Sequence, residues 1–276
     1  YKNVQNAAFA LNSDGGYLTG TMDDPEAFRL QSAEKVYFSV TLTAKNRGGH
    51  SSIPRRDNAI YDLADAIKKI QQFNFPISLN QTTRATLEFS MKDANDSEKS
   101  EMNMILNGIQ KDYKLLEKDP EMNALTRTTC VATKLEGGHA ENALPVSATA
   151  TVNCRLLPQD DSDEVLSIIR GLAGDEIVVS PITNVRKSPA SPITDEIVEL
   201  ISSSIDTAFP GLPIVPTMST GATDAIELRS NGVPVYGTSA MMTDPTGYRG
   251  HGLNERIEIT AFNATLDFWY ALMKQL

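Results

Sequence analysis

Histidine is scarce in this chain, and each of its three histidines follows a glycine. They are His50 in Gly-Gly-His-Ser-Ser, His139 in Gly-Gly-His-Ala-Glu-Asn and His251 in Gly-His-Gly-Leu-Asn-Glu-Arg. Imidazole is the commonest acid–base group near neutral pH and the commonest metal ligand in proteins. We therefore interpret these polar, glycine-containing segments as sites of metal binding or catalysis. Three surface loop histidines without such a role are the alternative interpretation.

The composition limits the partners that the chain can have. It has 276 residues, 41% of them hydrophobic, which is enough for one large domain or two ordinary ones. The net charge of −10 leaves no basic stripe to neutralise phosphates, so we expect no nucleic acid partner. No run approaches the ~18 consecutive apolar residues of a membrane span, so we expect no transmembrane segment.

The first residues indicate a piece of a longer protein. The chain begins with Tyr1 rather than methionine, and a strand-like apolar run at 7–11 follows almost at once. No segment of the signal-peptide type is present in the chain. The sequence does not identify a compartment, and we favour a periplasmic or secreted location over a cytoplasmic one.

Cys130 and Cys154 are too few for a disulfide framework or for a zinc knuckle with four close ligands. They lie on two strand-like segments, about equally far from a loop at 137–145. A disulfide between these strands is geometrically possible. We nevertheless expect two buried free thiols, because free cysteine is among the most buried residue types.

The middle of the chain has the pattern of an α+β domain. Residues 35–44 are rich in β-branched and aromatic residues, which is typical of a strand. Residues 58–73 and 160–172 carry apolar residues at helical spacing. Further strands are predicted at 128–135, 148–157 and 176–182. This order of elements predicts a ferredoxin-like sheet with its helices on one face and with surface helices inserted at 92–123.

The flanking segments have a different pattern. After residue 183, strands and helices alternate and are joined by glycine-rich loops. The predicted helices are 193–209, 222–231 and 260–276, and the predicted strands are 214–215 and 233–237. Such alternation predicts an α/β domain. We therefore expect an α/β portion that is interrupted by an inserted α+β domain.

Six short motifs carry a resemblance to a known family. They are Phe9-Ala-Leu-Asn-Ser-Asp-Gly-Gly, Gly48-Gly-His-Ser-Ser, Gly137-Gly-His-Ala-Glu-Asn-Ala-Leu-Pro, Cys154-Arg-Leu-Leu-Pro, Ser219-Thr-Gly-Ala-Thr-Asp and His251-Gly-Leu-Asn-Glu-Arg. Together, and in this order, they resemble the dinuclear-zinc carboxypeptidase and aminoacylase family of metallopeptidases. Enzymes of the glutamate carboxypeptidase, succinyl-diaminopimelate desuccinylase and Gly-X carboxypeptidase types belong to it. The resemblance covers essentially the whole chain.

The resemblance implies a zinc-exopeptidase-like α/β catalytic domain that is interrupted by a ferredoxin-like lid. Such a lid often forms a homodimer. On this chain, residues 35–182 correspond to the lid, and residues 1–34 and 183–276 correspond to parts of the catalytic domain. The boundaries that we predict from the pattern of strands and helices agree with this division.

The resemblance also implies two zinc ions. Asp14 corresponds to the carboxylate that completes one zinc site, and His251 corresponds to the imidazole that completes the other. Both side chains are donors that zinc accepts. Many members of the family have glutamate at the position of Asp14, so this residue departs from the pattern. Taken alone, Asp14 before two glycines is a typical turn residue.

Four further residues correspond to positions that contact the substrate. His50 corresponds to a lid histidine that donates a hydrogen bond to the developing oxyanion, often across the dimer. Such a donor raises the turnover rate by about 10²–10³-fold. Asn142 and Arg155 correspond to residues that bind the substrate's free carboxylate, and Gly221 corresponds to a backbone contact. The alternatives are a helix-capping role for His50 and a structural ion pair for Arg155.

Two segments that are typical of the family do not occur in the chain. His-x-Asp and Asp-Glu-Glu would supply the bridging aspartate, further zinc ligands and the glutamate general base. Since both normally precede the position of Asp14, we expect the chain to be the C-terminal part of such an enzyme. We therefore expect the isolated chain to bind zinc weakly and to be inactive.

The sequence thus predicts part of a metal-dependent hydrolase of the carboxypeptidase type. Such an enzyme cleaves the amide bond next to a free carboxylate in a small peptide or an N-acyl amino acid. An N-acyl-amino-acid deacylase shares all six motifs and is the first alternative. A non-catalytic dimerisation or binding fragment is the second.

Overall fold

The structure is a computed structural model that describes residues 6–242 and 252–276. The chain divides into two compact units, each with its own hydrophobic core. Unit 1 comprises Tyr1–Glu34, Leu79–Asp119 and Lys187–Leu276, and unit 2 comprises Lys35–Ser78 and Pro120–Arg186.

Unit 2 is built on a four-stranded antiparallel sheet. Its strands lie in the order β9 (Ile177–Pro181), β4 (Val36–Lys45), β8 (Ser147–Leu156) and β6 (Thr129–Gly137). Strand β4 pairs with β9 as well as with β8. The predicted ferredoxin-like sheet, with 35–44 and 176–182 in one sheet, is therefore confirmed.

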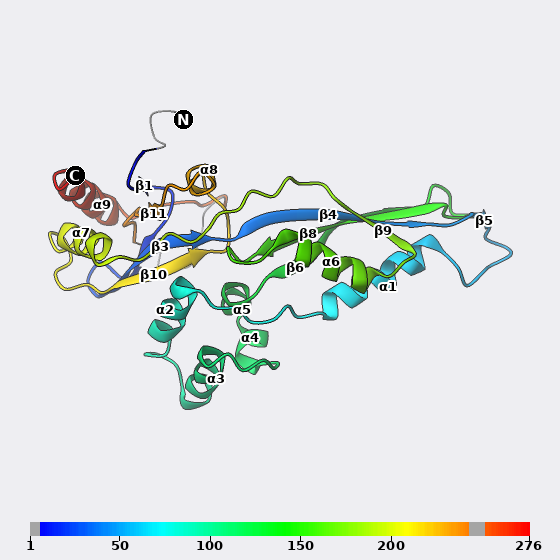
Figure 1. Cartoon of the computed structure of the whole chain (residues 1–276), viewed down its shortest axis with the longest axis horizontal. Helices are drawn as coiled ribbons and strands as arrows, with labels where there is room; N and C mark the ends of the chain where they lie inside the picture. The colour runs from blue at the N-terminus through cyan, green and yellow to red at the C-terminus, as the bar shows by residue number, and fades with distance from the viewer. Residues whose placement is uncertain (1–5, 243–251) are drawn as a thin grey trace. The chain divides into compact units, whose positions relative to one another are not determined.

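The central pair of this sheet is long and regular. Strands β4 and β8 pair without a shift from Val36↔Leu156 to Lys45↔Ser147. Beyond the Lys45 end, β5 (Gly49–His50) pairs with β7 (Ala143–Leu144), at the far end of β4 in Figure 1. A two-stranded ribbon thus continues from this end of the sheet.

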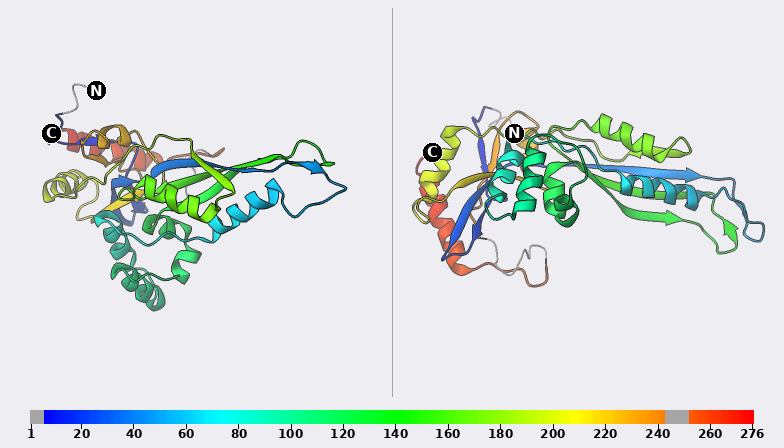
Figure 2. Two further views of the ribbon diagram at one scale, coloured as in Figure 1. Left: turned by 45° about the vertical axis from the view of Figure 1, so that its right-hand side comes forward. Right: turned by 90° about the horizontal axis from the view of Figure 1, so that it is seen from below.

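Two amphipathic helices cover one face of the sheet of unit 2. They are α1 (Ala59–Gln72) and α6 (Ser162–Ala173), which pack against each other (Figures 1 and 2). Every second residue of β8 is buried, from Ala148 to Leu156, because that face meets the helices. Asn153 and Arg155 face the other side and are half-buried, as the alternation predicts.

Unit 1 contains a mixed sheet of five strands. The main path runs β1 (Ala10–Asn12), β11 (Val235–Gly237), β3 (Pro25–Glu34) and β10 (Ile214–Ser219), and β2 (Tyr17–Gly20) also pairs with β3. Strand β1 is parallel to β11, and β10 is parallel to β3.

Helices α7 (Asp195–Ile205) and α9 (Ile259–Met273) complete the core of unit 1. Ile201 and Phe268 are fully buried there with Phe28 and Leu30 of β3. Among the described residues, no helix is long and apolar enough to cross a membrane. The predicted α/β portion with an inserted α+β domain is confirmed.

The inserted helices do not all belong with the ferredoxin-like sheet. Three of them lie in unit 1: α2 (Gln81–Ser90), α3 (Asp96–Leu106) and α4 (Lys114–Lys118). Helix α2 packs on β10, where Thr86 Oγ1 donates to the carbonyl of Pro216 at 2.8 Å, and Thr82 Oγ1 lies 2.7 Å from Ser32 Oγ. Only α5 (Pro120–Thr126) lies in unit 2. Unit 2 therefore differs from the expected block at 35–182 by the segment 79–119.

The prediction of two free thiols is wrong. Cys130 and Cys154 form a disulfide with an S–S distance of 2.01 Å. They are direct partners in the pairing of β6 with β8, and their Cα atoms are 4.0 Å apart. The strands thus hold the two side chains within bonding distance on the same face of the sheet.

Candidate active site

His50 and Asn142 lie next to each other at one end of unit 2. In the β5–β7 ribbon His50 pairs with Ala143, and the backbone N–H of Ser51 donates to the carbonyl of Asn142 at 3.0 Å. Both side chains are exposed. Although more than 90 residues separate them in sequence, the ribbon therefore places two of the predicted substrate-binding residues at one edge.

The ring of His50 has a defined tautomer. The backbone N–H of Ser52 donates to Nδ1 at 3.2 Å, and the Ser52 hydroxyl lies 2.8 Å from the same nitrogen. A backbone N–H can only donate, so Nδ1 accepts and carries no proton in the neutral ring. The neutral imidazole therefore has its proton on Nε2, which is the donor available to a ligand. The helix-capping alternative for His50 is wrong, because Asn58 caps α1.

The loop around His50 is held by Arg55. Its guanidinium donates to the carbonyl of Gly48 and to Asn46 Oδ1, each at 2.7 Å, and pairs with Asp57 at 3.0 Å. Hydrogen bonds from Arg55 and Asn46 lower the pKa of the Asp57 carboxyl to about 2. The turn before His50 thus has several fixed contacts even though it is exposed.

Arg155 lies at the opposite end of β8. It is eight residues beyond Ser147, or about 26 Å along the strand at ~3.3 Å per residue. Its guanidinium lies over the ring of Tyr37, 4.8 Å from the centroid. Within one chain, Arg155 is therefore far from His50 and Asn142.

A buried lysine lies near the Arg155 end of unit 2. Lys35 Nζ donates to the carbonyls of Ala124 and Arg127, both at 2.7 Å, and its side chain is fully buried. Burial lowers the pKa of Lys35 to about 7; the charge of Asp160 opposes this shift, and that of Arg155 adds to it. This end of the sheet therefore holds Arg155 and a buried lysine together with the acidic Asp160.

In unit 1, Asp14 lies on a tight turn directly after β1. The turn is closed by the Asp14 backbone N–H, which donates to Asn12 Oδ1 at 2.8 Å, and Asp14 itself is exposed. The two glycines that follow pack against Gly237. A Cβ added at Gly16 would lie 2.2 Å from the Gly237 carbonyl oxygen, and a Cβ added at Gly237 would lie 2.7 Å from the Gly15 carbonyl carbon. Glycine is therefore required for this close approach of the turn to β11.

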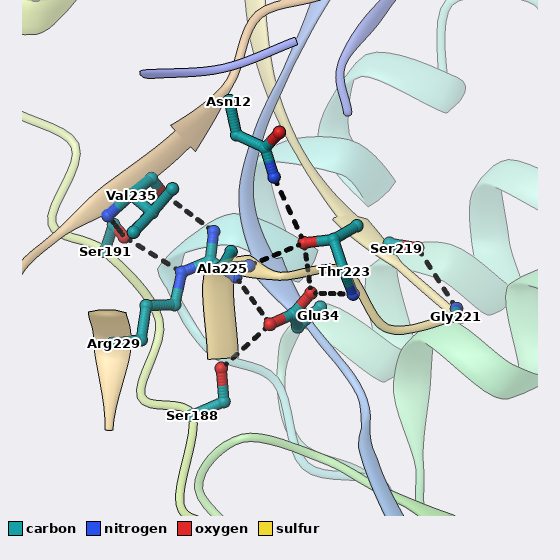
Figure 3. A network of polar contacts seen from close by, with 10 residues as sticks. All are labelled: Asn12, Glu34, Ser188, Ser191, Ser219, Gly221, Thr223, Ala225, Arg229 and Val235. Atoms are coloured by element: carbon teal, nitrogen blue, oxygen red, sulfur yellow. Dashed lines mark hydrogen bonds and ion pairs between the residues drawn. The ribbon is translucent and has the colours of Figure 1, made fainter. Parts of the chain in front are cut away.

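Gly221 lies on the loop between β10 and α8 (Ala225–Arg229). Its N–H donates to Ser219 Oγ at 3.1 Å. Two residues later, the N–H and the hydroxyl of Thr223 both donate to Oε2 of Glu34, each at 2.8 Å (Figure 3). The loop that carries Gly221 is therefore anchored to a side chain of β3.

Glu34 is a fully buried carboxylate with four polar contacts from three residues. Besides the two contacts from Thr223, its Oε1 accepts from Ser188 Oγ at 3.1 Å and pairs with Arg229 Nη1 at 3.3 Å. Arg229 also donates to the carbonyl of Val235 at 2.7 Å. A buried charge persists when it is paired and hydrogen-bonded in this way.

Four residues of this network were not predicted from the sequence: Asn12, Glu34, Thr223 and Arg229. Glu34 ends a segment of mixed polarity, and no spacing pattern links it to Thr223, which is 189 residues away. The available signal was an acidic residue directly before the strand predicted at 35–44. A buried ion pair between distant segments becomes visible only in the fold.

The described residues do not form a complete metal site. Within residues 6–242 and 252–276, no group of three or more His, Cys, Asp or Glu side chains is arranged to hold a metal ion. Asp14 supplies one exposed carboxylate. His251 lies outside the described residues. This donor set does not fit a zinc centre by itself, because a catalytic zinc normally has about three protein ligands.

Residues 32–179 match the family model described as the peptidase dimerisation domain. The chain therefore belongs to the M20 peptidase dimerisation-domain family. This agrees with the resemblance of the six motifs.

Curated relatives and a solved structure agree with this assignment. The chain is 28% identical over 244 residues to the probable carboxypeptidase S-like 2 of Dictyostelium discoideum, covering 87% of this chain and 47% of that protein. It is 25% identical to the N-fatty-acyl-amino acid synthase/hydrolase PM20D1 of Mus musculus, covering 97% of this chain and 55% of that protein. The chain thus spans about half the length of the curated relatives that it matches.

The fold is similar to that of an M20 family metallo-carboxypeptidase from Sulfolobus solfataricus. The TM-score is 0.59 at 19% sequence identity, covering 89% of this chain and 59% of that one.

Proposed function

We propose that this chain forms the lid and part of the catalytic domain of a metal-dependent hydrolase of the carboxypeptidase type. The enzyme cleaves an amide bond next to a free carboxylate. The observation that carries the proposal is the pair of His50 and Asn142 on the β5–β7 ribbon, with Nε2–H of His50 available as a donor. The names of the relatives, a carboxypeptidase and an N-acyl-amino acid hydrolase, support this reaction class.

His50 acts as the oxyanion donor in this proposal. As the amide carbonyl is attacked, negative charge develops on its oxygen, and Nε2–H donates a hydrogen bond to it. The contact from the Ser52 N–H to Nδ1 keeps the neutral ring in the required tautomer, with its proton on Nε2. Such a donor acts mainly in the transition state, so it contributes to turnover more than to substrate binding.

Asn142 and Arg155 bind the free carboxylate of the substrate in this proposal, and Gly221 supplies a backbone contact. The guanidinium of Arg155 is held over Tyr37 and is suited to binding a carboxylate with two hydrogen bonds. Lys35 lies within electrostatic range of Arg155. The cation that this end of unit 2 offers to the substrate carboxylate is therefore the guanidinium of Arg155.

A homodimer can bring His50 of one copy close to Arg155 of the other, although the two residues lie at opposite ends of unit 2. Strand β6 is the last strand of its sheet, and its residues from Val131 onward are exposed, so its outer edge can pair with another strand. Two copies that pair antiparallel along β6 across a two-fold axis place the His50 end of one copy beside the Arg155 end of its partner. We propose that each site takes His50 and Asn142 from one copy and Arg155 from the other.

The cofactor and the compartment are parts of the same proposal. The complete enzyme holds two zinc ions, one completed by Asp14 and the other by His251. The Cys130–Cys154 disulfide supports a periplasmic or secreted location, because disulfides persist in oxidising compartments.

The proposal is tested in an enzyme that joins this chain to the remaining half found in its relatives. Turnover is measured with an N-acyl amino acid, a dipeptide and the carboxamide form of each. His50→Ala should lower kcat by about 10²-fold or more with little change in KM. Arg155→Ala should raise KM and reduce the preference for the free carboxylate over the carboxamide. Unchanged kinetics in both variants would contradict the proposal.

A second candidate is an N-acyl-amino-acid deacylase without peptidase activity. The similarity to an N-fatty-acyl-amino acid synthase/hydrolase favours it. The same assay separates the two, because a deacylase turns over the N-acyl amino acid and not the dipeptide. The absence of turnover on every substrate would favour a non-catalytic dimerisation fragment.

A further inference from the structure

Asn12 lies between the two loops of unit 1 that carry predicted site residues. It is the last residue of β1 and is half-buried. Its Oδ1 accepts from the backbone N–H of Asp14 at 2.8 Å. Its Nδ2 donates to Thr223 Oγ1 at 3.4 Å (Figure 3). One side-chain amide therefore joins the turn of Asp14 to the loop of Gly221.

The orientation of this amide follows from the buried carboxylate. Glu34 is paired with Arg229, and an ionised carboxylate can only accept hydrogen bonds. The hydroxyl hydrogen of Thr223 is therefore directed at Glu34 Oε2, which is 2.8 Å away. The lone pairs of Thr223 Oγ1 remain for other donors. The group of Asn12 that faces this oxygen must then be its NH₂, which turns Oδ1 toward the N–H of Asp14.

The Thr223 hydroxyl oxygen is a shared acceptor. The backbone N–H of Ala225 also donates to it, at 3.2 Å, at the start of α8. Thr223 Oγ1 thus accepts one hydrogen bond from the start of α8 and a second one from Asn12. The series Glu34, Thr223, Asn12, Asp14 has a single consistent direction of hydrogen bonding.

We propose that Asn12 is a positioning residue for the active site, oriented by Thr223 and Glu34. It fixes the turn that carries the Asp14 carboxylate relative to the loop that carries Gly221. The assignment of Asp14 and Gly221 to the site rests on the proposed function, but the coupling between the two loops does not.

The coupling is tested on the 276-residue chain by NMR solvent exchange of the Asp14 amide, without substrate or metal. Thr223→Val keeps the shape of the side chain and removes the hydroxyl, so Asn12 loses its acceptor. The Asp14 amide should exchange about fivefold faster, as expected for the loss of one hydrogen bond. Thr223→Ser keeps the hydroxyl and should restore the wild-type rate.

A second variant and a matched control complete the experiment. Asn12→Ala should raise the Asp14 exchange rate at least as much as Thr223→Val, and the double variant should add little to Asn12→Ala alone. Asn231→Ala is the control, because that exposed asparagine of unit 1 donates to the carbonyl of Glu227 instead. It should leave the Asp14 amide unchanged.

The amide of Leu30, in the core strand β3, distinguishes positioning from loss of stability. Faster exchange at Asp14 with an unchanged rate at Leu30 supports the proposal. An unchanged Asp14 rate in Thr223→Val overturns it, and so does an equal rise at Asp14 and Leu30. Because no turnover is measured, this result is independent of the kinetic test of the proposed function.

Discussion

Lys35 is the first residue of unit 2, and its ammonium group is fully buried. Its pKa is lowered from 10.5 to about 7, whereas the unfolded chain keeps the ordinary value. Between about pH 7 and pH 10.5 the unfolded state therefore binds a proton that the folded state does not. The contribution of Lys35 to the free energy of unfolding should therefore rise as the pH increases from about 7 to about 10.5.

We expect Lys35→Met to remove this rise, as measured by urea unfolding at pH 7, 8 and 9. Lys69→Met is the control, because Lys69 is exposed on α1 of the same unit and should leave the pH dependence as in the wild type. Equal pH slopes for the wild type and Lys35→Met would show that the lysine stays charged when folded.

Gly237 gives a second prediction at the scale of one residue. A methyl group there would lie 2.7 Å from the Gly15 carbonyl carbon and 2.8 Å from Gln31 Cβ. Gly237→Ala should destabilise the fold by about 1–3 kcal/mol, because the turn of Asp14 must move. Gly171→Ala in α6 has open space within 4 Å and should stabilise by about 0.5–1 kcal/mol. Thermal unfolding of both variants measures these changes in stability. An unchanged stability of Gly237→Ala would contradict the requirement for glycine at this contact.

At the scale of the element, the disulfide fastens the edge strand β6 to β8. It closes a loop with a sequence separation of 24 residues, which corresponds to about 3 kcal/mol of stabilisation. Reductant should therefore lower the unfolding free energy of the wild type by roughly this amount, as measured by urea titration. The variant Cys130→Ala/Cys154→Ala should not respond to reductant. A wild type that is insensitive to reductant would refute the prediction.

The elements that could be predicted from sequence are those with one clear period. Strand β8 alternates strictly, so its two faces were assigned correctly. Helices α1 and α6 have apolar residues at helical spacing, so their existence and position were predicted. Strand β3 was missed because its buried residues include the polar Arg29, Gln31 and Glu34. Such a strand is stabilised by contacts with residues distant in sequence, such as that of Glu34 with Arg229. A local sequence pattern cannot reveal these contacts.

Helix α2 was missed for a related reason. Its sequence is rich in threonine, which has a low helix propensity, and Thr82, Thr83 and Thr86 are buried. The side chain of Asn80 caps the helix, and Thr86 bonds to the backbone of β10. The sequence could therefore single out His50 and Asn142, but it could not show the β5–β7 ribbon that brings them together. It also could not show that Asn12 and Thr223 join the loops of Asp14 and Gly221.

At the scale of the whole molecule, the predicted homodimer depends on the edge of β6. We expect the variant Val131→Lys/Leu135→Lys to shift the chain from dimer to monomer, because charges on an edge strand oppose pairing. Val178→Lys is the control on β9, the opposite edge strand, where Val178 is exposed. Sedimentation velocity measures the oligomeric state. A dimer that survives the β6 variant and dissociates in the β9 variant would place the interface on the other edge.

The second prediction at this scale concerns zinc. Asp14 and His251 are assigned to different zinc ions. Each ion therefore has fewer ligands from this chain than the roughly three protein ligands of a typical catalytic zinc site. The 276-residue chain should therefore bind zinc weakly, and Asp14→Asn should change its binding little. Isothermal titration measures this directly. Tight stoichiometric binding would mean that the ligands are assigned wrongly.

The unbroken pairing of β4 with β8 has a consequence for natural variation. The strands pair over ten residues each without a bulge, and the His50 and Arg155 ends lie at opposite ends of this ladder. Deleting one residue from either strand would turn every later side chain to the opposite face. Homologous chains should therefore keep the lengths of these two strands and vary in length in the loops at 51–58 and 138–142. We therefore expect the distance along the sheet between the His50 end and the Arg155 end to be the same in homologues that act on different substrates.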